Sequence, residues 1–164
     1  MKRWAGLLML ALLGACASYS GAGLVPGTAR LEDVQALMGP PALHWQDADG
    51  SVQLAYPRGP AGFDTYMVRL GPDGRLQSIA NVLDERSFAR IHAGLTQDEV
   101  LRLIGPPDAK RSAYFAARDE LAWDWRFRDV YFEAARFVVL FDASAGTVRS
   151  TLILREYPNR WRFP

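Results

Sequence analysis

Cysteine and histidine are nearly absent from this 164-residue chain, which contains one Cys and two His. A single cysteine forms no disulfide within the chain, and a metal site needs three or four convergent ligands. We therefore expect His44 and His92 to be neither metal ligands nor catalytic bases. No Gly-x-Ser-x-Gly phrase and no phosphate-binding glycine loop occurs either. The sequence predicts no catalytic residue, no metal, no cofactor and no small-molecule substrate.

Neither positive nor negative charge predominates in the sequence. The chain has 19 Lys and Arg against 18 Asp and Glu, a net charge of +1. No basic block is longer than two residues, which argues against nucleic-acid binding. The 49% hydrophobic and 23% charged residues are typical of a packed globular protein. This length suits one ordinary domain or two very small ones.

No long apolar run is present near the start of the chain. Leu7 to Leu13 is apolar, but it is well short of the ~20 residues that span a bilayer. Lys2 and Arg3 precede this run, and small residues follow it. A basic start, a short apolar run and a small-residue exit form the pattern of a secretory signal peptide, here residues 1–15.

Leu13-Gly14-Ala15-Cys16 resembles the lipobox of bacterial lipoproteins, in which the cysteine is acylated and becomes the new N-terminus. Because Ala17 and not Asp follows the cysteine, the resemblance implies the outer membrane of a Gram-negative cell, with the body facing the periplasm. The outer-membrane lipid would hold the chain through Cys16. Residues 16–26, which are small and Gly-rich, are predicted to be a flexible tether. The alternative is a plain secretory signal followed by an unmodified cysteine.

A short phrase occurs twice in the chain, as EDVQALMGPPA at 32–42 and within GLTQDEVLRLIGPPD at 94–108. In the second copy Thr96 and Glu99 form a capping box, and apolar residues follow at helical spacing. Gly105 suits a left-handed C-terminal position, and the two prolines after it end the helix. The first copy has the same apolar stripe, but one extra residue before it leaves no simple capping box.

Strand-like sequence follows each predicted helix. In 121–128, apolar and polar residues alternate, as in a half-buried strand, and 52–57 matches 119–124 in position. Charged residues on the open face, such as Asp124 and Arg136, are expected to form solvated cross-strand pairs. The predicted strands are 52–57, 65–70 and 75–83 in the first copy, and 121–128, 136–142 and 147–157 in the second.

The predicted fold is α+β, with two tandem small modules at 27–83 and 84–157. Each has one or two short helices followed by a three-stranded antiparallel sheet. The extra helix of the second module is expected at 84–91, with Phe88 and Ile91 on one face. Whether the two modules share one sheet stays open at this point.

The phrase FARIHAGLTQDEVLRLIGPPD, at 88–108, resembles the BamE/SmpA/OmlA group of small outer-membrane lipoproteins. The tandem arrangement is also similar to the β-lactamase-inhibitor protein fold, which has two such repeats. The first resemblance implies an accessory protein of the outer membrane, with β-barrel assembly components as partners. The second implies an inhibitor or sensor module that acts on a periplasmic enzyme.

We therefore expect a non-enzymatic, lipid-anchored scaffold or accessory protein that binds another protein. An inhibitor or sensor module is the alternative, and an enzyme with an unrecognised site is a third possibility. Aromatic residues are enriched where proteins bind each other. The tail 158–164 either covers the sheet or binds a partner. The candidate partner-binding residues are Trp45, which is placed with His44 in a loop, Tyr131, Phe132, Trp161 and Phe163.

Overall fold

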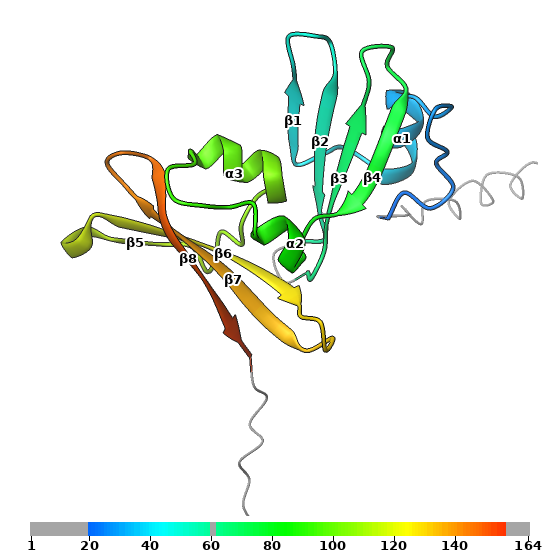
Figure 1. The fold of residues 1–164 in the computed structure, drawn as a ribbon. Helices are drawn as coiled ribbons and strands as arrows, with labels where there is room; N and C mark the ends of the chain where they lie inside the picture. Colours follow the sequence, from blue (N-terminus) through cyan, green and yellow to red (C-terminus); the bar gives the residue numbers. More distant parts are fainter. Residues whose placement is uncertain (1–19, 60–61, 157–164) are drawn as a thin grey trace, which may run out of the picture.

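The computed structural model describes residues 20–59 and 62–156. These residues form two separate four-stranded antiparallel sheets and a few short helices (Figure 1). The α+β class and the antiparallel strand order confirm the prediction from the sequence. Each sheet has one strand more than the three expected, and the two sheets do not join into one.

The first module begins with helix α1 (Leu31–Met38). Its strands are neighbours in chain order, and they are β1 (Leu43–Gln46), β2 (Val52–Pro57), β3 (Thr65–Leu70) and β4 (Leu76–Asn81). The bounds of β2 and β3 are those predicted, while β4 is shorter than the predicted 75–83.

The second module has two α-helices, α2 (Glu85–Phe88) and α3 (Gln97–Ile104), and a short 3-10 helix, η1 (Ala116–Arg118). The predicted short helix at 84–91 is confirmed as α2, and Phe88 and Ile91 are both buried. The strands are again neighbours in chain order, and they are β5 (Ala113–Phe115), β6 (Glu120–Arg128), β7 (Ala134–Asp142) and β8 (Thr147–Arg155).

The strands β1 and β5 are the two that the sequence did not reveal. His44 and Trp45, which were expected in a loop, lie on β1 and pair with Leu54 and Gln53 of β2. β5 has three residues, all of them exposed. Such short strands carry no clear apolar alternation, because backbone pairing with the neighbouring strand holds them in place.

Each module has its own apolar core between its sheet and its helices. In the first, Val34 of α1 packs on Leu54 of β2, and both are fully buried. In the second, the Phe88 ring stacks on Phe137 with 4.1 Å between centroids and meets Phe127 edge-on at 4.8 Å. Aromatic pairs of this kind contribute about 0.5–1.5 kcal/mol beyond the area they bury.

The caps of α1 and α3 differ as the sequence indicates. The Thr96 N–H donates to Glu99 Oε2 (2.7 Å) and the Glu99 N–H donates to Thr96 Oγ1 (3.3 Å), a complete capping box. The bond from the Thr96 N–H is the main cause that lowers the pKa of Glu99. At α1 only one of the two hydrogen bonds of a capping box exists, from the Arg30 N–H to Asp33 Oδ2 (2.8 Å). The other is missing because an arginine side chain has no acceptor atom.

Both helices end at a glycine with the same unusual backbone. Gly39 has φ 81° and ψ −167°, and Gly105 has φ 75° and ψ −170°. The positive φ agrees with the prediction, but ψ is extended where a left-handed helical value was expected. A proline follows each glycine and disfavours a helical ψ. Only glycine adopts this region of φ and ψ without strain.

Matching contacts relate the two modules. The Tyr56 hydroxyl donates to the Gly39 carbonyl and Trp125 Nε1 donates to the Gly105 carbonyl, both at 3.2 Å. Tyr56 therefore corresponds to Trp125. A second pair of contacts agrees with this match: the Ala42 N–H donates to the Ala55 carbonyl, and the Asp108 N–H donates to the Asp124 carbonyl.

This correspondence corrects the alignment of the strands. Residues 52–57 match 121–126, two positions later than the 119–124 predicted from the sequence. A shift of two residues keeps every side chain on its face, because strand side chains alternate with a period of two. The misalignment arose because Leu-Ala followed by an aromatic residue occurs in both β2 and β6.

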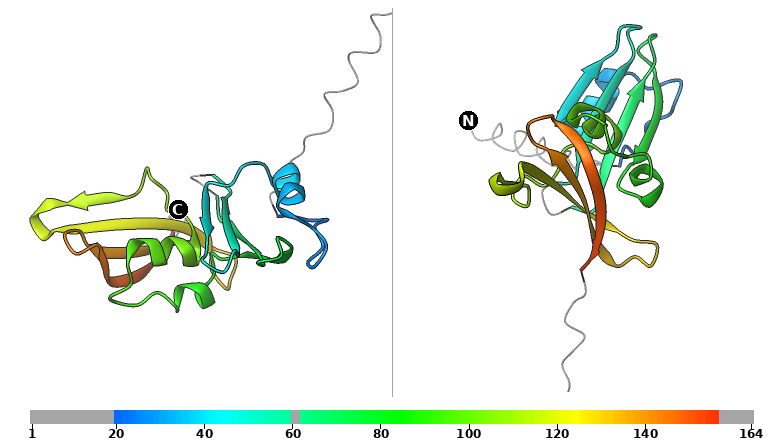
Figure 2. Two further views of the ribbon diagram at one scale, coloured as in Figure 1. Left: turned by 90° about the horizontal axis from the view of Figure 1, so that it is seen from above. Right: turned by 60° about the vertical axis from the view of Figure 1, so that its left-hand side comes forward.

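The helix α3 lies between the two sheets, while α1 covers the other face of the first sheet (Figures 1 and 2). Val100 and Ile104 of α3 belong to the core of the second module. Its opposite side contacts the first sheet, as described below. In space, the layers therefore follow in the order α1, the first sheet, α3 with α2, and the second sheet.

The chain is already folded before α1. Gly21 is buried, and a Cβ there would lie 2.5 Å from Ile79 Cδ1, so only glycine fits without a shift. Leu24 packs against the core of the first module. The flexible tether predicted for 16–26 is therefore wrong from Ser20 onward, because the small residues there permit close packing on the sheet. Cys16 and the rest of the predicted tether lie outside the described residues.

Candidate binding surface on the second sheet

The outer face of the second sheet is the side turned away from α3. A groove of about 350 Å³ runs along it. The rim residues Leu152 and Leu154 are 36% and 42% exposed. Large apolar residues exposed together mark candidate interaction sites. The apolar lining consists of Ala113, Phe115, Ala122, Val138, Leu140, Leu152 and Leu154. Charged residues also line the groove, and they are Arg111, Arg118, Glu120, Asp124 and Arg136.

β8 forms one edge of this sheet (Figure 2). The first two residues of β8 also bond to the segment before α3, through the Thr96–Thr147 bridge and the hydrogen bonds of Val148 with Gly94 and Leu95. Within the described part of the chain, the stretch from Ser150 to Leu154 pairs only with β7. From Arg149 to its end every residue of β8 is exposed, and 150–154 carries no charge. A long, apolar, unpaired edge favours addition of a strand from another chain.

A buried ion pair forms part of the floor of the groove. The Asp124 side chain is 2% exposed and the Arg136 side chain 26%. Arg136 Nε donates to Asp124 Oδ1 (3.1 Å), and Arg136 Nη2 donates to Asp124 Oδ2. These hydrogen bonds are the main cause that raises the pKa of Arg136. The solvated pair expected from the sequence is wrong, because the Asp124 side chain is buried. The segment beside β6 is in contact with this strand there, since the Asp108 N–H donates to the Asp124 carbonyl (2.8 Å).

Phe63 links the loop before β3 to the far end of β6. The guanidinium carbons of Arg126 and Arg128 lie 4.4 and 4.3 Å from the centroid of its ring. Such cation–π contacts add about 0.5–1 kcal/mol at exposed sites. Arg126 also donates to Glu156 Oε2 from Nε (3.0 Å) and Nη2 (2.7 Å). Phe63 was not among the predicted contact residues, because nothing in the sequence of a Gly- and Pro-rich loop indicates which distant cations an aromatic ring will contact.

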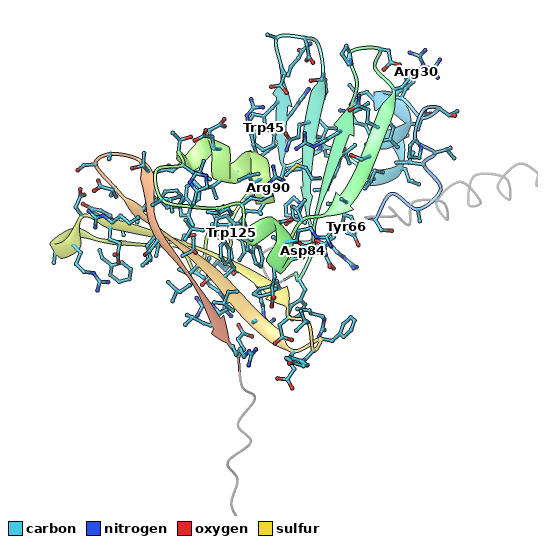
Figure 3. All side chains as sticks on the ribbon, viewed as in Figure 1. Arg30, Trp45, Tyr66, Asp84, Arg90 and Trp125 are labelled. Carbon is cyan, nitrogen blue, oxygen red and sulfur yellow. The ribbon has the colours of Figure 1, made fainter. Side chains whose placement is uncertain are left out.

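On the first sheet, the face opposite α1 holds α3. Trp45 lies between β1 and α3 (Figure 3), and its Nε1 donates to Asp98 Oδ1 (3.0 Å). Arg102 Nη1 donates to Asp47 Oδ1 (2.8 Å), and the Arg102 guanidinium carbon lies 5.5 Å from the centroid of the Trp45 ring. The bond from Trp45 is the main cause that lowers the pKa of Asp98, and the bond to Asp47 is the main cause that raises the pKa of Arg102.

The C-terminal end of α3 lies directly on the sheet. A Cβ at Gly105 would be 2.7 Å from Thr65 Cγ2 and 3.6 Å from the Ala55 Cβ. Thr65 and Ala55 are 2% and 0% exposed. Gln53, also buried, donates from Nε2 to the Arg102 carbonyl (2.5 Å). The first sheet is therefore covered by a helix on both faces.

The groove on the second sheet is the counterpart of the face that holds α3. Because Tyr56 corresponds to Trp125, Gln53 corresponds to Ala122, Ala55 to Asp124 and Met67 to Val138. All three residues of the second sheet line the groove. No described segment of the chain covers them as α3 covers the first sheet.

The turn between β6 and β7 exposes three apolar residues in a row. Val130, Tyr131 and Phe132 are 66%, 72% and 79% exposed. The carboxylate of buried Asp129 accepts a hydrogen bond from the Tyr131 N–H (2.9 Å), and Phe132 has φ +59°. A non-glycine residue with positive φ persists only where its surroundings hold it. The hydrogen bonds to Asp129 and the backbone of this turn therefore hold its apolar side chains exposed to solvent.

The structure does not bring the candidate partner-binding residues together. Tyr131 and Phe132 lie at the β6–β7 turn, whereas Trp45 contacts Asp98 and Arg102 between the modules. Trp161 and Phe163 lie outside the described residues. The sequence did not predict the residues of the groove as a binding surface. The only sequence feature that could have indicated them is the uncharged run at 150–154.

The described residues contain no group of three or more His, Cys, Asp or Glu side chains placed to hold a metal ion. Of the two histidines, His92 contacts the Ala93 carbonyl through Nδ1 (3.1 Å). No helix among the described residues is long and apolar enough to span a bilayer.

Comparison of the chain with models of known protein families, with curated proteins and with solved structures gave no match.

Proposed function

We propose that this chain is a lipid-anchored, non-enzymatic docking protein of the Gram-negative outer membrane, with its body in the periplasm. The lipobox-like sequence before Cys16 supports the anchor and the location. The resemblance of 88–108 to the BamE/SmpA/OmlA group supports an accessory role in outer-membrane protein assembly or envelope integrity, with β-barrel assembly components as candidate partners.

One observation carries the docking role. No residue within 20–59 or 62–156 covers the groove on the second sheet, although α3 covers the corresponding face of the first sheet. Burial of apolar surface drives protein association. An apolar face beside a free strand edge therefore suits a protein partner.

A cross-linking experiment in whole cells tests this function. The cells are treated with a mild cross-linker, solubilised in detergent, and the proteins attached to the chain are identified by mass spectrometry. We expect Leu152→Lys, at the groove rim, to lose the partner. Thr151→Lys, the exposed neighbour whose side chain points to the other face of β8, is the matched control. Equal recovery of the partner with both variants would rule out the groove as the docking surface.

The anchor has a separate test. We expect the wild-type chain to fractionate with outer membranes and Cys16→Ala to lose the acyl chains, as mass spectrometry of the N-terminal peptide would show. An unmodified Cys16 in the wild-type chain would remove the anchor from the proposal and leave the docking surface to be judged by itself.

The β6–β7 turn favours a second candidate, an inhibitor or sensor module for a periplasmic enzyme. A rigid turn that exposes Tyr131 and Phe132 suits insertion into a cleft, since aromatic anchors dominate such interfaces. Saturable binding of one soluble periplasmic hydrolase, lost in Tyr131→Ser and kept in Leu152→Lys, would favour this candidate over docking at the groove.

A further inference from the structure

Helix α1 presents an uncovered face that matches the face by which α3 binds the first sheet. The two helices correspond residue by residue, with Gly39 at the position of Gly105 and the same backbone angles. A Cβ at Gly39 would meet nothing within 4 Å, whereas one at Gly105 would meet Thr65 and Ala55. The face that is buried on α3 is therefore open on α1.

The exposed residues of α1 fit this role. Glu32 and Ala36, both exposed, hold the positions of Asp98 and Arg102, the two α3 residues that bind β1 and the adjoining turn. Among the residues that the structure describes, each chain thus has an uncovered helix face at one end and an uncovered sheet face at the other. Within one chain, the equivalent face of α3 contacts the equivalent face of the first sheet.

We propose that the groove on the second sheet binds helix α1 of a second copy of this chain, as the first sheet binds α3 within one copy. The inference rests on the proposed docking function in using the same groove, and it names the partner of that groove. It requires no change of shape, because both faces are already present in the described structure.

Charge favours this pairing. The first turn of α1 carries the exposed acids Glu32 and Asp33, and its last turn has no basic residue. The groove is lined by three arginines, Arg111, Arg118 and Arg136, and by two acids, Glu120 and Asp124, which pair with Arg118 and Arg136. The lining therefore has one positive charge more than it has negative charges, which favours the acidic first turn of α1.

Apolar contacts also match. The position of Asp47, which binds Arg102 in the first module, corresponds to Phe115 on β5, since β1 and β5 pair in the same way with β2 and β6. Ala36 takes the place of Arg102 on α1. The ion pair of the internal contact would thus be replaced by contact between an alanine and a phenylalanine ring.

The arrangement is head to tail. The helix face and the groove lie on different modules, so one contact leaves a free helix face and a free groove on the outer copies. Such a heterologous contact extends into chains of subunits and does not close as a two-fold dimer does. Copies held on one membrane meet at a high effective concentration, which favours a weak contact of this kind.

Two single-cysteine variants test the proposal in the acylated chain, incorporated at high density into phosphatidylcholine vesicles. Glu32→Cys marks the helix face and Ala113→Cys, at the position of Trp45, marks the groove. A short bismaleimide is added to each variant alone and to their mixture. We expect a cross-link between positions 32 and 113 in the mixture and no dimer with either variant alone, because each face meets the other face and never itself.

A change in the groove checks that the cross-link reports the proposed contact. Ala122→Lys on the Ala113→Cys chain is expected to reduce the cross-linked product roughly tenfold or more, because Ala122 holds the position of Gln53, which α3 covers, and a lysine there would be buried without a partner. Thr151→Lys on the same chain points away from the groove and is expected to leave the yield unchanged.

Two results in the vesicles would overturn the proposal: a cross-link between two Ala113→Cys chains, and absence of product at every density. In whole cells, a link from position 113 to a different protein alone would also overturn it and would leave the proposed docking function intact. The wild-type chain tests the anchor separately, because an acylated Cys16 does not react. If Cys16 does react, the same mixture made with Cys16→Ser still decides the head-to-tail contact.

Discussion

Gly39 and Gly105 show how one residue type serves two purposes at equivalent positions. Both need glycine for their backbone angles, but only Gly105 also lies against another sheet. Alanine at Gly39 should cost about 1–3 kcal/mol of stability through backbone strain alone. Gly105→Ala should cost about 1–3 kcal/mol more, because its Cβ would meet Thr65 Cγ2.

Urea unfolding of the two alanine variants measures this difference. Thr65→Ser removes the methyl group that the new Cβ would meet, so it should recover part of the extra cost in Gly105→Ala and none of the cost in Gly39→Ala. Equal losses for the two single variants would show that α3 does not press on the first sheet as described.

The pair Asp124–Arg136 makes the second prediction at this scale. Asp124→Asn leaves the partly buried Arg136 without its counter-charge, and we expect a loss of about 3 kcal/mol. Arg58→Gln breaks the exposed pair with Asp64, whose atoms lie 3.6 Å apart, and should cost less than about 1 kcal/mol. Denaturant titrations at neutral pH compare the two, and a small loss for Asp124→Asn would mean that water reaches the floor of the groove.

At the scale of elements, α3 joins the modules through a contact that depends on pH. The Trp45 hydrogen bond lowers the pKa of Asp98 below its usual 3.8. A lowered pKa in the folded state stabilises the protein above the unfolded value and loses this effect as the pH falls through the folded value. The Asp98 contribution should therefore be complete at neutral pH and fade below about pH 4.

Thermal unfolding of wild type and Asp98→Asn at several pH values tests this. The difference between their midpoints should be present at pH 7 and shrink in acid. Trp45→Phe removes the donor, so the same comparison made in that variant should show a smaller pH-dependent difference. The effect will be modest, since the Asp98 side chain is 61% exposed.

The sequence predicts elements well where periodicity is strong. It identified β2, β3, α2 and the capping box of α3, because apolar spacing and capping residues are local signals. It missed β1 and β5, whose few residues are held by pairing to a neighbour. The outer groove was missed for a related reason. Alternation in β6 marks Ala122 and Asp124 as solvent-facing, and only the tertiary packing shows that they form the floor of a groove.

For the whole molecule, α3 makes the two cores interdependent. One of its sides belongs to the second core and the other covers the first sheet. Leu54→Ala, in the first core, should cost about 3 kcal/mol and lower the unfolding midpoint by roughly 6–12 °C. Because the cores share α3, we expect a single unfolding transition in which both modules take part.

Fluorescence and circular dichroism distinguish shared from separate unfolding. In a background with Trp4, Trp45 and Trp161 replaced by Phe, Trp123 and Trp125 report the second core, and the far-UV signal reports both sheets. In Leu54→Ala the two signals should still coincide at the lower midpoint. If the tryptophan signal keeps its wild-type midpoint while the far-UV signal splits, the modules unfold independently.

The burial of Gly21 has a consequence for the order of events during biogenesis. If Cys16 is acylated as proposed, only three residues separate the lipid from Ser20, where the described fold begins. Fully extended, that stretch reaches about 14 Å. An enzyme that works on Cys16 within the membrane would compete with the first sheet for the same few residues. Acylation and cleavage at Cys16 would therefore have to precede the packing of Gly21 against Ile79. In a chain that folded earlier, the enzyme could not reach Cys16.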